Sequence, residues 1–194
     1  TDLHSVTDGS EEISRILVSP EPKAKRTVEG DLGVYLNMKN IVNSIGRDKL
    51  EEELDFDIDK VMENYKFVPQ TKEEVRFVER LTKEAVIKAT ERHAGRIRYV
   101  YGPTGRSTLA EGKDLSQIKY IIGTGGALTR LPERINIMKA IARHNETGLL
   151  LFPNTEAEIL VDNDYIMASL GVLSKRYRDA AVYFLEKSLR QKLV

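Results

Sequence analysis

The chain has 194 residues, and its 30 lysines and arginines balance its 30 aspartates and glutamates, so the formal net charge is zero. A balanced chain has no general electrostatic attraction to nucleic acid or to an anionic membrane, and we expect neither as a partner. The absence of cysteine excludes disulfides, thiolate nucleophiles and cysteine-ligated metal sites, and we expect a cytoplasmic protein of one domain or two small ones.

The N-terminal part of the chain predicts short strands followed by a helix. Residues 3–6 and 13–18 are weakly alternating stretches on either side of an Asp-Gly turn, which favours two strands. Residues 26–30 favour a further short strand. Apolar residues at three- and four-residue intervals predict a helix over residues 32–45, which Asp31 could cap and Gly46 would end.

The next part, residues 47–95, is predicted to be mainly helical. Residues 48–66 are acidic and carry apolar residues at helical spacing, which indicates one or two short helices. Thr71 and Glu74 have the spacing of a capping box, and the helix behind them is expected to continue to about His93 with one apolar face. The acidic stretch lacks the ligand order of a calcium loop, so we interpret it as a solvated face.

Strands and helices alternate in the remainder of the chain. Short apolar or aromatic runs predict strands at residues 98–101, 120–122 and 159–161, and residues 102–107 indicate a turn-rich loop. Helical spacing predicts helices from Pro132, over residues 166–173 and over residues 180–193, and residues 162–164 offer N-caps for the second of them. The element order predicts an α/β fold, in which helices cover a mixed sheet. We assign residues 1–46 and 96–194 to this domain and residues 47–95 to a helical insert.

The sharpest local pattern is a glycine loop that follows a short strand and precedes a helix. It reads Ile121-Ile122-Gly123-Thr124-Gly125-Gly126-Ala127-Leu128-Thr129. Glycines without a Cβ atom let the backbone approach a flat or anionic ligand closely, and successive amides can accept an anion. The spacing matches neither the dinucleotide fingerprint nor the P-loop. A tight strand-to-helix turn without a ligand therefore stays open as the alternative.

The histidines give no sign of a metal site. His4, His93 and His144 are far apart in the sequence and lack metal-ligand spacing. We interpret each of them as a structural or surface residue, and we predict no metal ligand and no catalytic residue in this chain.

The glycine loop resembles the adenosine motif of the superfamily of actin, heat-shock chaperone and sugar-kinase ATPases, in which a strand delivers a Gly-Gly turn to the adenosine and α-phosphate. Residues 1–6 resemble the tail of that superfamily's second phosphate loop. Residues 29–33 resemble the entry to the first helix of its second lobe, and residues 164–171 resemble its closing helix. The resemblance implies one lobe of the actin-like (ribonuclease H-like) ATPase fold.

At the family level, the chain resembles the MutL/GlmL proteins, which are unrelated to the mismatch-repair protein of the same name. The segments that carry this resemblance are Thr27-Val28-Glu29-Gly30-Asp31-Leu32-Gly33, residues 118–130 and residues 162–174. This family is the accessory protein encoded beside adenosylcobalamin-dependent glutamate mutase. Membership implies part of an ATP-dependent reactivating chaperone, which exchanges damaged cobalamin from the inactivated mutase as its lobes open and close.

The resemblance also implies which parts of the nucleotide site are present. The first phosphate loop and the Asp-x-Gly-Gly part of the second would precede Thr1, and a start at Thr rather than Met indicates a fragment or a processed product. We expect a C-terminal lobe that holds the adenosine side of ATP or ADP, while Mg²⁺ needs the missing loops and ATPase activity needs the full-length protein. The implied binding residues are Gly123, Thr124, Gly125, Gly126, Ala127 and Thr129, with Thr124 or Thr129 as hydroxyl partners.

Two other functions remain open at this stage. The chain could belong to a small-molecule kinase of the same superfamily, or it could be a non-catalytic module that docks the mutase through its helical insert. The mutase itself could be glutamate mutase or an ornithine or lysine aminomutase.

Overall fold

The computed structural model describes residues 1–103, 105–145 and 148–190. For residue 190 it describes the backbone only. The strands are β1 (Asp2–Val6), β2 (Ala24–Val28), β3 (Arg96–Gly102), β4 (Gly105–Glu111), β5 (Tyr120–Gly123) and β6 (Glu158–Val161). The helices are α1 (Glu11–Ile16), α2 (Met38–Ile45), α3 (Arg47–Leu54), α4 (Ile58–Asn64), α5 (Lys72–His93), α6 (Gly126–Arg130), α7 (Arg134–Arg143), α8 (Met167–Leu173) and α9 (Arg178–Arg190). The α/β class is confirmed.

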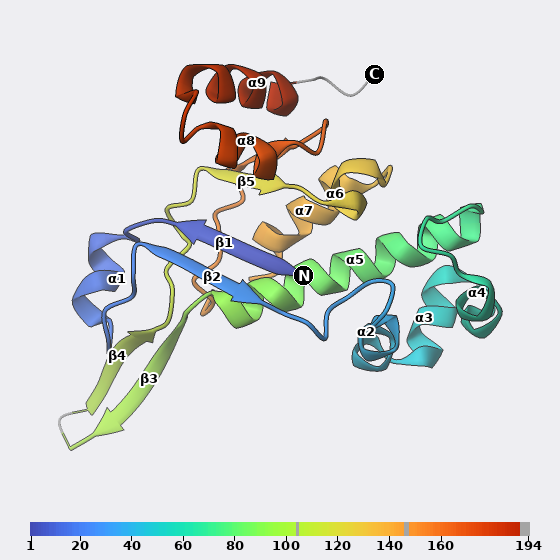
Figure 1. Ribbon diagram of the computed structural model, residues 1–194. Coiled ribbons are helices and arrows are strands. Elements are labelled where there is room, and N and C mark those ends of the chain that lie inside the picture. The colour runs from blue at the N-terminus through green and yellow to red at the C-terminus, as the bar shows by residue number, and fades with distance from the viewer. Residues whose placement is uncertain (104, 146–147, 191–194) are drawn as a thin grey trace.

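The described strands pair into three two-stranded sheets rather than the single mixed sheet that we expected. β1 and β2 are antiparallel, β3 and β4 form an antiparallel hairpin, and β5 and β6 are parallel. Figure 1 shows the β3–β4 hairpin projecting away from the other elements. The expectation of one sheet failed because periodicity locates strands but does not say which strands pair.

Helix α5 runs through the middle of the molecule and is buried on two sides (Figure 1). Phe77, Leu81 and Ala85 pack in one cluster with buried residues of α2, α3 and α4. Val78 and Val86 lie on another side of α5 and pack in a second cluster, with residues of α7. The prediction of a single apolar face was therefore wrong, since neighbouring positions 77 and 78 both face buried partners. The capping box at Thr71 is confirmed.

The expected strand over residues 13–18 is instead helix α1. Ser10 caps it, because the Ser10 side chain accepts a hydrogen bond from the Ile13 amide, 3.2 Å away. Glu11 and Glu12 in the first turn complement the positive end of the helix. The apolar positions 13, 16 and 17 fit a helix as well as a strand, so the local cap decides the outcome.

Helix α2 is shorter than the prediction. It begins at Met38 rather than at residue 32, with Asn37 at its N-cap position, so Asp31 is not its cap. Its end at Gly46 is confirmed: Gly46 has a φ of 95°, and its amide donates to the Val42 carbonyl at 2.9 Å. The acidic stretch forms the two helices α3 and α4, as expected.

The rest of the chain largely follows the predicted order, with one missed strand. We expected a turn-rich loop after residues 98–101, but the backbone continues as β4, and Gly102 pairs with Gly105 at the end of the hairpin. Thr104 in that loop and residues 191–194 of the predicted last helix lie outside the described residues. The division into a lobe and an insert stays a prediction. In the described part of the chain, no helix combines the length and the apolar character needed to cross a membrane.

Candidate functional site

The glycine loop lies where β5 ends and α6 begins. β5 ends at Gly123, which pairs with Val161, the last residue of the parallel strand β6. In open α/β sheets, ligands bind beyond the carboxyl ends of parallel strands. Residues 124–125 follow one such end and Asp162 follows the other, so the topology brings these two turns together.

The glycines of the loop differ in whether the surrounding structure favours glycine at their position. A Cβ on Gly123 would collide with the thioether of Met138 and lie 3.3 Å from the Cβ of Leu128, so glycine leaves room for these two side chains. Gly125 has a φ of 91°, a conformation that favours glycine, but a Cβ there would meet no atom within 4 Å. Gly126 has neither a positive φ nor a neighbour within 4 Å of its Cβ position. Open space beside the backbone is thus present at Gly125 and Gly126, and not at Gly123.

The two threonines of the loop already have hydrogen bonds within the protein. Thr124 is exposed, and its hydroxyl donates to Oδ2 of Asp162 at 2.9 Å. Thr129 is buried, and its hydroxyl lies 3.4 Å from the Gly126 carbonyl oxygen. Ala127 is half-buried and packs against the cluster that includes Val86. Of the predicted hydroxyl partners, Thr124 is the one accessible to a ligand.

Asp162 is the residue of this site that the sequence interpretation undervalued. We expected Asp162 only as one of several possible caps for the helix that follows. Its carboxylate is fully buried and does cap that helix, because it accepts from the amides of Ile166 and Met167 at 3.1 and 2.9 Å. It also accepts from Thr124, which connects the cap to the glycine loop. A polar residue directly after the second of two parallel strands was the available signal.

The electrostatics at Asp162 favour a carboxylate. Burial alone would raise the pKa of Asp162, but hydrogen bonds from Met167, Ile166, Thr124 and Ser188 outweigh this effect, and the pKa lies below its ordinary value. The side chain is therefore an ionised acceptor at neutral pH, and it holds the turn after β6 next to the glycine loop.

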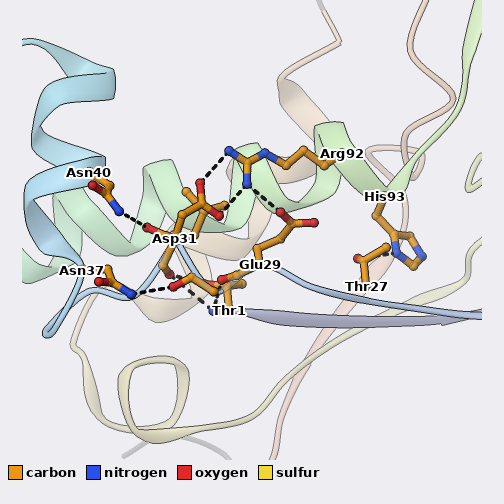
Figure 2. Close-up of polar contacts among 10 residues, drawn as sticks. Thr1, Thr27, Glu29, Asp31, Asn37, Asn40, Arg92 and His93 are labelled. Atoms are coloured by element: carbon orange, nitrogen blue, oxygen red, sulfur yellow. Dashed lines mark hydrogen bonds and ion pairs between the residues drawn. The ribbon is translucent and has the colours of Figure 1, made fainter.

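A second polar cluster lies at the turn after β2, where Arg92 of α5 meets Glu29 and Asp31 (Figure 2). The guanidinium donates to both Asp31 oxygens at 2.8 Å and to Glu29 at 2.6 Å. Hydrogen bonds from Arg92 lower the pKa of Asp31, and these carboxylates raise the pKa of Arg92. Arg92 is thus paired with both carboxylate side chains.

The backbone of the same turn is also held by side chains. Asn37 donates to the Gly30 carbonyl at 2.7 Å, as Figure 2 shows. The Thr1 hydroxyl donates to the Leu32 carbonyl at 2.7 Å. The segment that resembles the tail of a phosphate loop therefore lies beside the segment that resembles the entry to the first helix of the second lobe.

The histidines do not form a metal site within the described residues. His93 is fully buried, with its ring nitrogens 2.7 Å from the Ser5 hydroxyl and 2.9 Å from the Thr27 hydroxyl. Burial lowers the pKa of His93 to about 4, so the ring is neutral at pH 7 and joins α5 to β1 and β2. No group of three or more His, Asp or Glu side chains in the described part of the chain is placed to hold a metal ion.

The two best-formed pockets on the described residues lie away from the glycine loop. One has a volume of about 490 Å³ and is lined by residues around the end of α5 and the base of the β3–β4 hairpin, among them Lys25, Arg96 and Glu111. The other lies over residues 8–15. The glycine loop lines neither of these two pockets.

Comparison with known proteins places this chain. The family described as MutL protein matches residues 1–189. Protein MutL of Clostridium tetanomorphum is 35% identical over 198 residues, which cover 97% of this chain and 43% of that protein. This chain thus spans less than half the length of that relative, and no solved structure matches it. The chain belongs to the MutL protein family.

Proposed function

We propose that this chain provides the adenosine side of an ATP or ADP site in an accessory protein that reactivates an adenosylcobalamin-dependent mutase. The observation that carries the nucleotide part is the open space at Gly126. No backbone strain and no packing contact of the described residues requires glycine there, and this open glycine lies just beyond the carboxyl ends of the parallel strands β5 and β6, where a ligand could approach the backbone closely. The mutase part rests on membership of the MutL family and on the resemblance of this chain to the accessory protein of glutamate mutase.

In this proposal, the backbone of residues 124–126 packs against the ribose and the α-phosphate. Gly125 and Gly126 leave room for the ligand, and the exposed Thr124 is able to accept a hydrogen bond from it while donating to Asp162. Gly123 and Thr129 have a different role from the one that we first assigned. Both are buried, so they support the loop rather than contact the ligand.

Within the described ranges, no group of three or more acidic or histidine side chains is placed to hold a metal ion. We therefore assign phosphate and metal binding to a second lobe, in keeping with the greater length of the MutL relative. The actin-like lobe itself is part of the proposal. Catalysis of phosphoryl transfer depends on positioned phosphate and metal ligands. Residues 1–194 alone should hydrolyse ATP no faster than buffer does, and robust Mg²⁺-dependent turnover would contradict this assignment.

The reactivation cycle follows from a nucleotide held between two lobes. A ligand that binds the closed form better than the open form shifts the population toward closure. Coupled to a bound mutase, this motion would release damaged cobalamin and admit intact cofactor. The test is the exchange of cobalamin from inactivated glutamate mutase by the full-length protein. Exchange that needs ATP supports the proposal, and exchange at the same rate without nucleotide would contradict it.

The acidic helices α3 and α4 are a second surface to test in this context, as the docking site for the mutase. Their apolar residues Leu50, Leu54 and Ile58 are buried in the first core cluster, so the exposed part of the stretch is polar. Glu53 pairs with Arg80 at 2.6 Å, which makes its reversal a structural change. Exposed Asp48 and Glu52 are the cleaner positions, and reversing both to lysine should reduce capture of the mutase without changing nucleotide affinity. Undiminished capture would place docking elsewhere.

A docking module without nucleotide chemistry is the second candidate. It is favoured by the internal hydrogen bonds of Thr124 and Thr129, which give the loop a structural explanation. Titration of the full-length protein with ADP separates the two candidates, because a module of this kind has no adenosine site. A kinase of the same superfamily would be recognised by phosphoryl transfer to an added sugar or acid.

A further inference from the structure

Asp162 lies at a junction of three parts of the molecule. Its two carboxylate oxygens accept hydrogen bonds from Thr124 in the glycine loop, from two amides at the start of α8, and from the Ser188 hydroxyl of α9 at 3.0 Å. Asp162 and Ser188 are both fully buried. Among the described residues, Asp162 forms no salt bridge, so neutral donors alone solvate its charge.

Helix α9 is joined to the turn after β6 through Ser188. It packs on α8 and β6, and Figure 1 shows it at the outer edge of the molecule, beyond α8. Val182, Tyr183 and Phe184 in its middle are all about half exposed. Around Ser188 the contacts are specific: its hydroxyl accepts from the Asp164 amide at 3.0 Å, and its carbonyl accepts from the Asn163 side chain at 2.7 Å. Ser188 thus connects α9 to the turn that Asp162 organises.

Donors that share one buried charge are not independent. When one donor is lost or turns away, the others must compensate for the same carboxylate, and low local dielectric makes the effect large. Oδ2 serves Thr124 and Met167, and Oδ1 serves Ile166 and Ser188. Rotation or displacement of this carboxylate would thus change the contact with the loop and the contact with α9 together.

We propose that Asp162 is a positioning residue that couples the glycine loop to helix α9. The inference rests on the proposed function in one respect, namely that the loop is where the nucleotide binds. A nucleotide that fixes Thr124 stabilises one orientation of the Asp162 carboxylate and with it the position of α9. By reciprocity, an event that moves α9 changes nucleotide affinity by the same factor.

The first test measures ADP affinity of the full-length protein by calorimetry. Thr124→Val removes the hydroxyl at nearly constant shape, and Ser188→Ala removes the donor on α9; each should weaken ADP binding by about threefold to tenfold. Thr124→Ser keeps the hydroxyl and should restore affinity. Thr124 is the residue through which Asp162 reaches the ligand, so once Thr124→Val has removed that hydroxyl, adding Ser188→Ala should weaken ADP binding by no more than about a further twofold.

The control is Ser174→Ala, which removes a hydroxyl that donates to the Gly171 carbonyl at 2.8 Å on the exposed side of α8. It should leave ADP affinity unchanged. Additive losses in the double variant, or wild-type affinity in Ser188→Ala, would overturn the coupling. Thermal unfolding of each variant shows whether it is folded. If Ser188→Ala does not fold, the comparison of Thr124→Val with Thr124→Ser still tests the coupling.

The second test needs no nucleotide and separates failure of the coupling from failure of the proposed function. Amide hydrogen exchange of residues 178–190 should be faster in Thr124→Val than in Thr124→Ser, although residue 124 lies outside α9. If the wild-type protein binds no ADP but this difference is present, the nucleotide proposal fails and the coupling stands. Equal exchange of α9 in the two variants would overturn the coupling whether or not ADP binds.

Discussion

The glycine loop and the turn after β2 are two polar turns that the fold treats in opposite ways. At the turn after β2, Arg92 neutralises Glu29 and Asp31, and side chains occupy the backbone carbonyls. At the glycine loop, one buried carboxylate fixes the loop from the inside, while the outer side at Gly125 and Gly126 stays open. Both turns follow a strand and are rich in polar groups, and both have a glycine with no atom within 4 Å of its Cβ position, Gly30 and Gly126. They differ in that charged side chains pair with one another across the turn after β2, whereas no ion pair lies on the described residues of the glycine loop.

The difference indicates which turn is available to a ligand. A ligand at residues 29–31 would have to compete with short, charged hydrogen bonds from Arg92, which are among the stronger ones in proteins. At Gly126, no protein atom of the described residues lies within 4 Å of the Cβ position. We therefore interpret the Arg92 cluster as structure and the glycine loop as the binding edge, and the predictions below test each half of this comparison.

The largest effect is expected from the support of the loop. Asp162→Ala leaves buried donors from Thr124, Ser188 and the start of α8 without their acceptor. Hydrogen bonds to a charged group contribute about 1.5–3 kcal/mol each, so the loss of unfolding free energy should reach about 3 kcal/mol or more. Urea unfolding measures it. A loss below about 1 kcal/mol would show that the carboxylate is not the support of the loop.

The second effect is a pH dependence of stability at the turn after β2, near which His93 is buried next to Arg92 in the sequence. Burial lowers the pKa of His93 from 6.5 to about 4. Between these values the unfolded chain binds a proton that the folded protein does not, so stability is full above pH 6.5 and falls as the pH drops toward 4. A shift of this size corresponds to about 3 kcal/mol at most.

His93→Gln removes the titrating group while keeping a polar side chain between Ser5 and Thr27. Its unfolding free energy should be lower at pH 7 and should vary less than that of the wild type between pH 6.5 and 4. Parallel pH profiles for the two proteins would mean that His93 does not contribute to the pH dependence. Asp31 and Asp162 have lowered pKa values, so their titration belongs below this window.

A smaller effect is expected from Arg92→Met, which keeps the length of the side chain and removes its charge. Glu29 and Asp31 then lose their shared partner, and the midpoint of thermal unfolding should decrease, because two carboxylates remain close together without a cation. ADP affinity should stay within about twofold of the wild-type value, since the turn is structural in our interpretation. Loss of ADP binding in a folded Arg92→Met protein would reverse the comparison.

Sequence reasoning located the elements whose signals are local. Thr71 and Glu74 marked the start of α5, and Gly46 marked the end of α2, because caps act within a few residues. The glycine loop was found for the same reason. Sequence reasoning also predicted that the loop lies between a strand and a helix, and β5 does precede it and α6 does follow it.

The features that the sequence did not reveal depend on distant partners. The pairing of β1 with β2 skips α1, and α5 is buried on two sides by helices that come before and after it. Asp162 contacts Thr124 across 38 positions and Ser188 across 26. The different roles of Gly123 and Gly126 follow from Met138, which no local pattern places against the loop.

The most direct measurement of the central claim is the ADP affinity of the full-length protein carrying Gly126→Val. Gly125→Val is less informative, because the φ of 91° makes any side chain there strained whether or not a ligand binds. Gly171→Val is the matched control: Gly171 is also an exposed glycine with no atom within 4 Å of its Cβ position, but it lies in α8. We predict that Gly126→Val weakens ADP binding by about fivefold or more, which corresponds to about 1 kcal/mol. The ADP affinity of Gly171→Val should stay near the wild-type value, and so should the stability of both variants. Unchanged ADP affinity in folded Gly126→Val would contradict the assignment of the glycine loop as the adenosine site.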